Sequence, residues 1–228
     1  MTAVEVAVQM DTTCARTPDG RVLCWGWNDY CGQLGDGTKV DRLEPVEVPG
    51  LSGVTDLVAG STYACAVTGD GALSCWGCNF TGQLGDGTTE ERPSPVVVPG
   101  LSDVKNVTSS GSQTCATLGD GTARCWGGDT PDHAQLWTDC PEPRTHRAEG
   151  PRDDGSWVIG PVDTYCVAPA PFSGLTGVLQ AVPGSLHACA LLRDGTVRCW
   201  GSNFYGSIGD GTGGGLDHDR AVPTPVAL

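Results

Sequence analysis

The chain has 228 residues, enough for one or two domains, and its 34 glycines and 16 prolines are too many for a helical bundle. Its 27 acidic residues outnumber 13 lysines and arginines, and the formal net charge of −14 repels phosphate backbones and anionic lipid surfaces. No apolar run approaches the ~20 residues that a membrane-spanning helix needs. We therefore expect no nucleic acid partner and no membrane insertion.

The first predicted element is a hairpin at residues 14–26, C-A-R-T-P-D-G-R-V-L-C-W-G, which recurs at 65–77, 115–127 and 189–201. Each copy has two cysteines ten positions apart and an Asp-Gly dipeptide midway, which is typical of a tight turn between two strands. A three-residue loop, Pro18-Asp19-Gly20, places Cys14 directly opposite Cys24, within the reach of a disulfide. The pattern predicts four cross-strand disulfides: Cys14 with Cys24, Cys65 with Cys75, Cys115 with Cys125, and Cys189 with Cys199.

Zinc and reduced thiols are the alternatives for these cysteines. Structural zinc sites use cysteines two to four positions apart, and among the repeats only Cys75 and Cys78 have this spacing. Disulfides indicate a compartment outside the reducing cytosol, so we expect an extracellular or periplasmic protein. Residues 1–13 show neither a basic start nor a long apolar stretch, so no signal peptide is visible. A trimmed precursor or an excerpt of a longer chain would reconcile the two observations.

Further short segments complete a unit of about 50 residues around each hairpin. A short apolar stretch precedes the hairpin, and G-Q-L-G-D-G-T or a close variant follows it in three units. A proline-flanked strand such as 95–98 ends the unit. Four strands per unit at this period are typical of propeller blades. We expect an all-β fold of β-propeller-type repeats, with four blades of about four antiparallel strands at 3–51, 52–101, 102–175 and 176–228.

These motifs resemble the regulator-of-chromosome-condensation repeat family, and most closely its bacterial, cysteine-bearing members. The resemblance rests on C-A-x-x-x-D-G-x-x-x-C-W-G, N-x-x-G-Q-L-G-D-G-T and P-V-x-V-P-G-L, and it covers nearly the whole chain except about 129–168. It implies a β-propeller, usually of seven blades. Four units favour an open arc or partial propeller, with a closed four-bladed ring as the alternative. An open arc has two exposed flanks, which would imply a homo-oligomer or further blades that complete the ring.

The third unit contains an insertion at 129–168, which adds 24 residues relative to the second unit. We expect Cys140 and Cys166 within it to bridge each other. Cys31 and Cys78 are then left over, with a bridge between blades as one possibility. A long disulfide-pinned loop on a repetitive scaffold is a common place for binding function, although an insertion without function is the alternative. The candidate contact residues are of the types found at interface anchors: Trp137, Arg144, His146, Arg147 and Trp157.

Other residues that suggest chemistry have simpler explanations. The aspartates of the G-D-G-T segments, Asp36, Asp86 and Asp210, lack a calcium-ligand ladder and suit tight turns. His187 holds a variable repeat position, and the segment Asp217-His218-Asp219 suits a solvated loop better than a metal site. The repeated tryptophans suit packing between blades better than carbohydrate stacking: Trp25, Trp76, Trp126 and Trp200. We expect no metal and no cofactor.

The sequence favours a non-enzymatic, extracytoplasmic protein-binding module that presents propeller loops, especially 129–168, to an unidentified protein. No catalytic constellation recurs at suitable spacing. One alternative is an inhibitor of a secreted hydrolase, since a bacterial propeller similar to this family inhibits β-lactamases. The family resemblance also implies a guanine-nucleotide exchange factor-like activity, which resides in a full seven-bladed ring in a reducing compartment. A hydrolase that uses His133, His146 and Asp153 or Asp154 is the weakest alternative.

Overall fold

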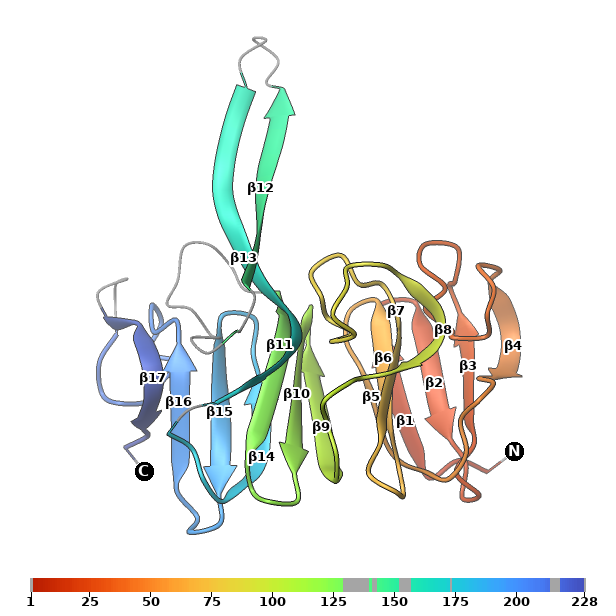
Figure 1. Ribbon diagram of the computed structural model, residues 1–228, viewed down its shortest axis with the longest axis horizontal. Coiled ribbons are helices and arrows are strands. Elements are labelled where there is room, and N and C mark those ends of the chain that lie inside the picture. The colour runs from red at the N-terminus through yellow and green to blue at the C-terminus, as the bar shows by residue number, and fades with distance from the viewer. Residues whose placement is uncertain are drawn as a thin grey trace.

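The computed structural model describes residues 2–128, 140, 143–151, 157–172, 174–213 and 218–227, and for 143–151 and 157–165 it describes the backbone alone. The described residues form four antiparallel β-sheets that stand side by side in an arc (Figure 1). The structure therefore confirms the all-β, propeller-type fold. Within the described residues, no helix has the length and apolar character required to cross a membrane.

Each sheet is one blade, and in blades 1, 2 and 4 the strands follow one another in chain order from the inside of the arc outward. Blade 1 contains β1 (Glu5–Gln9), β2 (Thr12–Arg16), β3 (Val22–Gly26) and β4 (Arg42–Glu47). Blade 2 contains β5 (Val54–Ala59), β6 (Tyr63–Thr68), β7 (Leu73–Gly77) and β8 (Arg92–Val97). Blade 4 contains β14 (Val178–Pro183), β15 (His187–Leu192), β16 (Val197–Gly201) and β17 (Arg220–Pro225).

Blade 3 has a fifth strand. It contains β9 (Val104–Ser110), β10 (Gln113–Leu118), β11 (Ala123–Gly128), β12 (Pro143–Pro151) and β13 (Trp157–Pro171), in the order β12-β13-β11-β10-β9. β13 is long enough to serve two purposes: its second part pairs with β11 as the outer strand of the blade, and its first part pairs with β12.

The Asp-Gly turns form as the sequence predicts. Thr17 N donates to Arg21 O at 2.9 Å, and Gly20 adopts a left-handed φ of 79° that glycine accepts without strain. The register pairs Cys14 with Cys24, and the disulfide joins them across a Cα–Cα distance of 4.1 Å.

The same cross-strand disulfide forms in the other three blades, and in each of them the two cysteines lie directly opposite each other in the register. The bonded pairs are Cys65 with Cys75, Cys115 with Cys125, and Cys189 with Cys199. Their Cα–Cα distances are all 4.1 Å, as in blade 1. The four predicted cross-strand disulfides are therefore confirmed, and the zinc and reduced-thiol alternatives for these cysteines are wrong.

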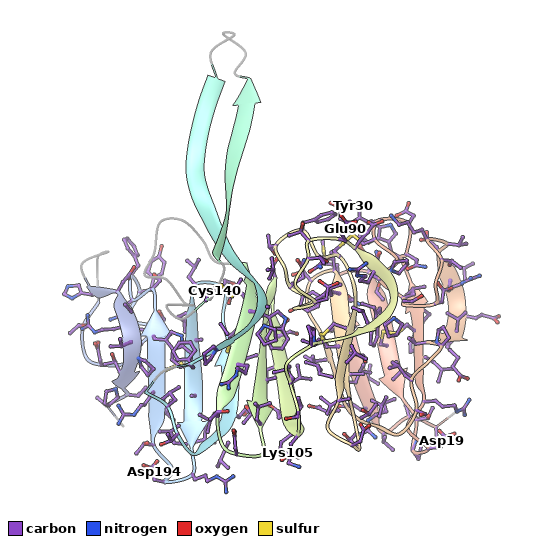
Figure 2. All side chains as sticks on the ribbon, viewed as in Figure 1. Asp19, Tyr30, Glu90, Lys105, Cys140 and Asp194 are labelled. Carbon is purple, nitrogen blue, oxygen red and sulfur yellow. A yellow bond between two sulfur atoms is a disulfide. The ribbon has the colours of Figure 1, made fainter. Side chains whose placement is uncertain are left out.

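Alternating strand directions separate two edges of the arc. The turn edge carries the four Asp-Gly turns, and the loop edge carries the long connections that follow β3, β7 and β16. Figure 2 shows Asp19 and Asp194 at the turn edge and Tyr30 and Glu90 at the loop edge. The β12–β13 hairpin rises from the loop edge of blade 3, well beyond the sheets (Figure 1).

The blades pack through the repeated tryptophans and the loops of the preceding blade. The Trp76 ring lies against Gly35 of blade 1, and the Trp126 ring lies against Gly85 of blade 2. Trp126 Nε1 also donates to Gln83 O at 2.9 Å. Trp76, Trp126 and Trp200 are fully buried, whereas Trp25 is only half-buried because no described blade precedes it. The expected packing between blades therefore holds for three of the four tryptophans.

The arc is open. β1 contacts β5, β5 contacts β9 and β9 contacts β14, so neighbouring blades touch in chain order. Blades 1 and 4 lie at opposite ends of the arc (Figure 1).

Candidate interaction surface

A buried polar framework shapes each long connection of the loop edge. In blade 2, Asn79 Nδ2 donates to Asp86 Oδ1 at 3.0 Å and to Thr88 O at 3.1 Å, while Asn79 Oδ1 accepts from Leu84 N at 3.0 Å. Arg92 closes the loop with an ion pair of 2.7 Å to Asp86 Oδ2. Because these polar atoms are paired inside the chain, the framework constrains the backbone of the loop.

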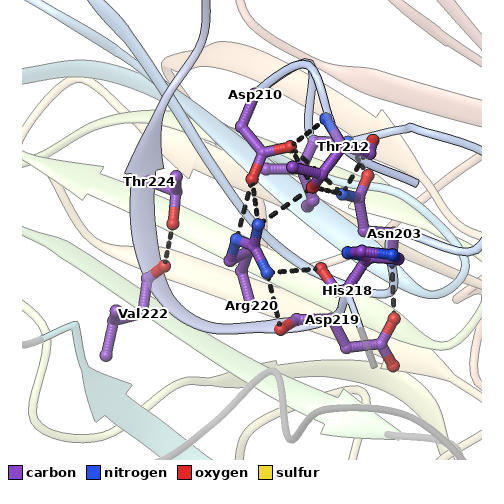
Figure 3. A network of polar contacts seen from close by, with 9 residues as sticks. Asn203, Asp210, Thr212, His218, Asp219, Arg220, Val222 and Thr224 are labelled. Atoms are coloured by element: carbon purple, nitrogen blue, oxygen red, sulfur yellow. Dashed lines mark hydrogen bonds and ion pairs between the residues drawn. The ribbon is translucent and has the colours of Figure 1, made fainter. Parts of the chain in front are cut away.

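The framework repeats in blades 1 and 4. Figure 3 shows the blade 4 copy, in which Asn203 Nδ2 donates to Asp210 and to Thr212, and Arg220 pairs with Asp210 Oδ2 at 2.6 Å. The hydrogen bond from the Thr212 hydroxyl, with help from Arg220, lowers the pKa of Asp210 to about 2. Burial alone would raise the pKa of Asp86, but hydrogen bonds from Thr88 and Arg92 outweigh it and lower that pKa as well. These carboxylates are paired structural anions rather than general bases.

The sequence predicts only a turn-forming role for these aspartates, and the structure shows that they also hold the rest of the loop. Their bond to the backbone two positions on is present, as in Thr38 N to Asp36 Oδ1 at 2.9 Å. The arginine and asparagine partners of these aspartates were not predicted from the sequence. A signal was available, because Arg42 and Arg92 each follow the G-D-G-T aspartate by six positions, and an asparagine precedes every copy of the segment.

A covalent bond and an ion pair join the loops of blades 1 and 2. Cys31 and Cys78 form a disulfide with a Cα–Cα distance of 5.0 Å, which resolves the pairing that the sequence left open. Lys39 of the first loop forms an ion pair with Glu91 beside the second. The two loops are therefore joined to each other at the loop edge.

Exposed aromatic side chains lie next to this disulfide. Trp27 and Tyr30 stack with ring centroids 5.7 Å apart, and Phe80 of blade 2 meets Tyr30 edge-on, also at 5.7 Å. Tyr30 is 51% exposed and Phe80 is 52% exposed. We call Trp27, Tyr30 and Phe80 the aromatic cluster. It matches the large, rigid side chains that dominate protein interfaces.

The sequence analysis missed the aromatic cluster because its members lie in two repeats. Tyr30 is 50 positions from Phe80, and each residue alone is an unremarkable aromatic in a variable part of its loop. Blade 4 places Phe204 and Tyr205 in the corresponding loop, where Tyr205 is 93% exposed. The available signal was an aromatic residue within two positions after the loop asparagine in each of these units.

Where the structure describes the insertion, β12 and the first part of β13 pair as an extended β-hairpin, whereas we expected a long disulfide-pinned loop. We call the β12–β13 hairpin the arm. Strand-favouring residues explain the change, since β13 begins W-V-I-G-P-V-D-T-Y. The predicted Cys140–Cys166 disulfide forms at the base of the arm, where Cys166 lies opposite Gly127 of β11. The bond therefore ties the arm to the blade.

The predicted contact residues fall mostly on the arm. Arg144, His146 and Arg147 lie on β12, opposite Tyr165, Asp163 and Val162 of β13 in the backbone register. Trp157 pairs with Pro151 at the far end of the arm. Trp137, together with His133, Asp153 and Asp154 of the hydrolase alternative, lies outside the described residues. The contact role of the five predicted residues stays a prediction.

His187 and the segment Asp217-His218-Asp219, which the sequence also singled out, make contacts that support the fold. Burial lowers the pKa of His187, which is half-buried at the start of β15. In the segment Asp217-His218-Asp219, Asp219 Oδ1 accepts from Asn203 N at 2.7 Å, and His218 O accepts from Arg220. Where the structure describes side chains, no three His, Cys, Asp or Glu residues gather closely enough to hold a metal ion.

Comparisons with known proteins agree with the repeat pattern. Two family models of the regulator of chromosome condensation (RCC1) repeat match the chain, one at residues 19–67 and 70–117 and the other at 54–83 and 182–207. The chain belongs to the RCC1 repeat family. The chain is 37% identical over 79 residues to the ultraviolet-B receptor UVR8 of Arabidopsis thaliana. This aligned segment covers 33% of this chain and 18% of the receptor. It is 42% identical over 62 residues to the protein pim1 of Schizosaccharomyces pombe, which covers 27% of this chain and 11% of pim1.

Solved structures show the fold over the whole arc. Yeast RCC1 (Prp20), solved bound to Kap60, superimposes with a TM-score of 0.75 at 21% identity and covers all of this chain and 49% of that chain. Human WBSCR16 superimposes with a TM-score of 0.69 at 22% identity and covers all of this chain and 53% of that chain. This RCC1-repeat chain therefore spans about half the length of the solved propellers that it matches, and less than a fifth of the two curated relatives.

Proposed function

We propose that this RCC1-repeat chain is a non-enzymatic protein-binding module that works outside the cytosol and holds its partner at the loop edge. One observation carries the proposal: the arm, the aromatic cluster and the long connections all lie at the same edge of the arc, opposite the tight turns (Figures 1 and 2). Polar frameworks and two disulfides fix these elements on rigid sheets. A preorganised surface loses little conformational entropy when it binds.

The chemistry of the surface supports a protein partner. Exposed Tyr30 and Phe80 supply apolar contact area, and the arm adds strand backbone that extends into solvent. Proteins of this fold are known in complexes, since yeast RCC1 was solved with Kap60 and a second structural study of Prp20p reports its binding properties to Gsp1p and histones. The carboxylates of the three G-D-G-T segments, Asp36, Asp86 and Asp210, are paired with arginines, which supports a structural role for them rather than a catalytic one.

The cysteines support the proposed compartment. All twelve cysteines of the sequence are paired in six disulfides. Such a number of disulfides is typical of proteins in an oxidising environment. We place the protein in the extracellular space or the periplasm, and inhibition of a secreted hydrolase would be a special case of the same binding function.

The experiment compares what the oxidised chain and three variants capture from the extracytoplasmic protein fraction of the source cells. The arm variant replaces residues 143–165 with a short Gly-Ser linker and keeps Cys140 and Cys166. The cluster variant carries Tyr30→Ala and Phe80→Ala. The matched control carries Asp120→Ala and Asp194→Ala at the turn edge. Captured proteins are identified by mass spectrometry and their affinities are then measured with purified components.

We expect one or more proteins that bind the wild type and the control equally, and that bind the arm or cluster variant at least about tenfold more weakly. Equal capture by all four chains, or a loss confined to the turn-edge control, would contradict the proposal. Purified partners that are hydrolases are then assayed for inhibition. Accelerated nucleotide release from a small GTPase would instead support the exchange-factor alternative.

A further inference from the structure

The two loops joined by the Cys31–Cys78 bond contain more acidic than basic side chains. Residues 27–42 and 78–92 hold six aspartates and glutamates but only three lysines and arginines. Each of these three cations already has an anionic partner within the loops: Lys39 pairs with Glu91, Arg42 with Asp36, and Arg92 with Asp86. Three carboxylates of this described part of the chain remain without a cation, and we call them the open carboxylates: Asp29, Asp41 and Glu90.

Two of the open carboxylates lie beside Trp27 and Tyr30 of the aromatic cluster. Asp29 is exposed and directly precedes Tyr30 in the chain. Asp41 is also exposed, and its Oδ1 atom accepts from Asn28 N at 2.7 Å, which places Asp41 next to the residue that follows Trp27. Both carboxylates are therefore close to the stacked rings.

The third open carboxylate, Glu90, belongs to blade 2 and lies near Tyr30 as well. Lys39 Nζ donates to Tyr30 O at 3.3 Å and also pairs with Glu91, so the exposed Glu90 beside it is brought near Tyr30 (Figure 2). Tyr30 and Phe80, which meet edge-on, are each about half exposed. The surface therefore combines accessible aromatic rings with a local excess of negative charge.

This combination selects the charge of the occupant. An apolar segment would withdraw the open carboxylates from water without pairing them, and an acidic segment would be repelled by them. A lysine or arginine side chain can pair with a carboxylate and can also lie on the face of an aromatic ring, which attracts cations. Because the cations of the two loops are already paired inside the chain, the cation has to come from another molecule.

We propose that the aromatic cluster and the open carboxylates bind a basic segment of the protein partner, with an arginine or lysine side chain placed against Tyr30 and Phe80. This proposal rests on the function proposed above and adds the chemical class of segment that the loop edge recognises. Recognition then depends on charge as well as on apolar area, so the surface rejects acidic and purely apolar segments.

The first test uses short synthetic peptides of equal length as probes. In these peptides glycine alternates with arginine, with lysine or with glutamate, and the oxidised full chain is titrated with each of them. We expect the arginine and lysine peptides to bind and to shift the NMR signals of the aromatic cluster, whereas the glutamate peptide does not bind. Failure of both basic peptides to bind, or shifts confined to other parts of the chain, would overturn the proposal.

A second test separates a local site from general attraction to an acidic protein. Asp29→Asn with Glu90→Gln removes two charges beside the aromatic cluster, whereas Asp120→Asn with Asp194→Asn removes two charges from the turn edge, so the two double variants have the same net charge. We expect the first variant to weaken binding of the arginine peptide about fivefold and the second to leave it nearly unchanged. Unchanged melting temperatures show that both variants fold. Equal weakening by the two variants would show that the overall charge holds the peptide, and it would contradict a local site.

A third test concerns the rings. Tyr30→Leu with Phe80→Leu keeps apolar side chains but removes the ring faces that attract a cation, and we expect it to weaken binding of the arginine peptide about fivefold. The matched control is Tyr205→Leu, because Tyr205 is 93% exposed in the corresponding loop of blade 4. The proposal is wrong if the cluster variant binds the arginine peptide as tightly as the wild type does.

The captured partner distinguishes failure of this proposal from failure of the proposed function. We expect the partner to lose affinity for Asp29→Asn with Glu90→Gln, and crosslinks from the loop edge to fall on a segment that carries lysine or arginine. A partner that binds this variant as well as the wild type, yet is lost from the arm variant or the cluster variant, would leave the proposed function intact and overturn the basic segment. If capture depends on neither the arm nor the cluster, both proposals fail.

Discussion

At the scale of single residues, the same buried aspartate recurs in three of the four blades and holds the long connection of each. Asp36, Asp86 and Asp210 each accept from a backbone N–H group and a threonine, and each pairs with an arginine. Their side chains are at most 9% exposed, so the arginine compensates a charge that is almost withdrawn from water. The framework holds the backbone that carries the aromatic cluster.

We predict that Asp86→Ala lowers the free energy of unfolding by about 2 kcal/mol, because Asn79, Thr88 and Arg92 lose an acceptor in a buried setting. The matched control is Asp120→Ala, since Asp120 makes a similar bond to Thr122 at an exposed turn. We expect the control to cost clearly less than Asp86→Ala, because Asp120 and its partners keep access to water. Urea denaturation with the disulfides intact measures both values, and equal losses would contradict the burial argument.

At the scale of elements, the disulfides within a hairpin and those between elements have different roles. Four disulfides join residues only 10 positions apart, so they fix strands that already pair. The Cys31–Cys78 bond spans 47 positions and joins two blades. The Cys140–Cys166 bond fixes the base of the arm. The Cys31–Cys78 bond therefore controls how two blades are placed, whereas the Cys140–Cys166 bond joins the two ends of one hairpin.

We predict that Cys31→Ser with Cys78→Ser destabilises the arc by about 4 kcal/mol in the chain-entropy model, because the bond closes a long loop of the unfolded chain. Cys14→Ser with Cys24→Ser opens a much shorter loop and should cost about 1 kcal/mol less. Denaturant midpoints compare the two double variants. A larger loss for the cross-strand pair would show that local strand pairing, rather than blade placement, limits stability.

At the scale of the whole molecule, acidic groups dominate the surface charge and also the response to acid. Hydrogen bonds from threonines, strengthened at some sites by arginines, lower the pKa of aspartates in every blade: Asp19, Asp36, Asp70, Asp86, Asp120, Asp194 and Asp210. Burial raises the pKa of Asp56, which acts in the opposite direction. The aspartates with a lowered pKa outnumber the one with a raised pKa, so they decide whether acid stabilises or destabilises the folded chain.

We predict that the free energy of unfolding declines as the pH falls from about 4 toward 2. A carboxyl whose pKa is lower in the folded chain contributes stability above its unfolded pKa of about 3.9, and that contribution is lost as the pH falls through the folded value, which is about 2 for Asp210. Melting temperatures between pH 7 and pH 2 test this, and Asp210→Asn should show a shallower decline. Stability that rises on acidification would contradict the assignment.

The sequence by itself determined the hairpins, the cross-strand disulfides, the four blades and the family, because each Asp-Gly turn and the two strands beside it are local and recur in every repeat. It also indicated the Cys140–Cys166 bond. Only the tertiary structure decided the strand character of the arm, the Cys31–Cys78 bond, the aromatic cluster and the exposure of Trp25. The Cys31–Cys78 bond, the aromatic cluster and the exposure of Trp25 depend on which blade lies beside which, whereas the arm depends on the pairing of β12 with β13. A residue such as Val6 looks like its buried counterparts in the sequence, and only the described arc shows that it is exposed.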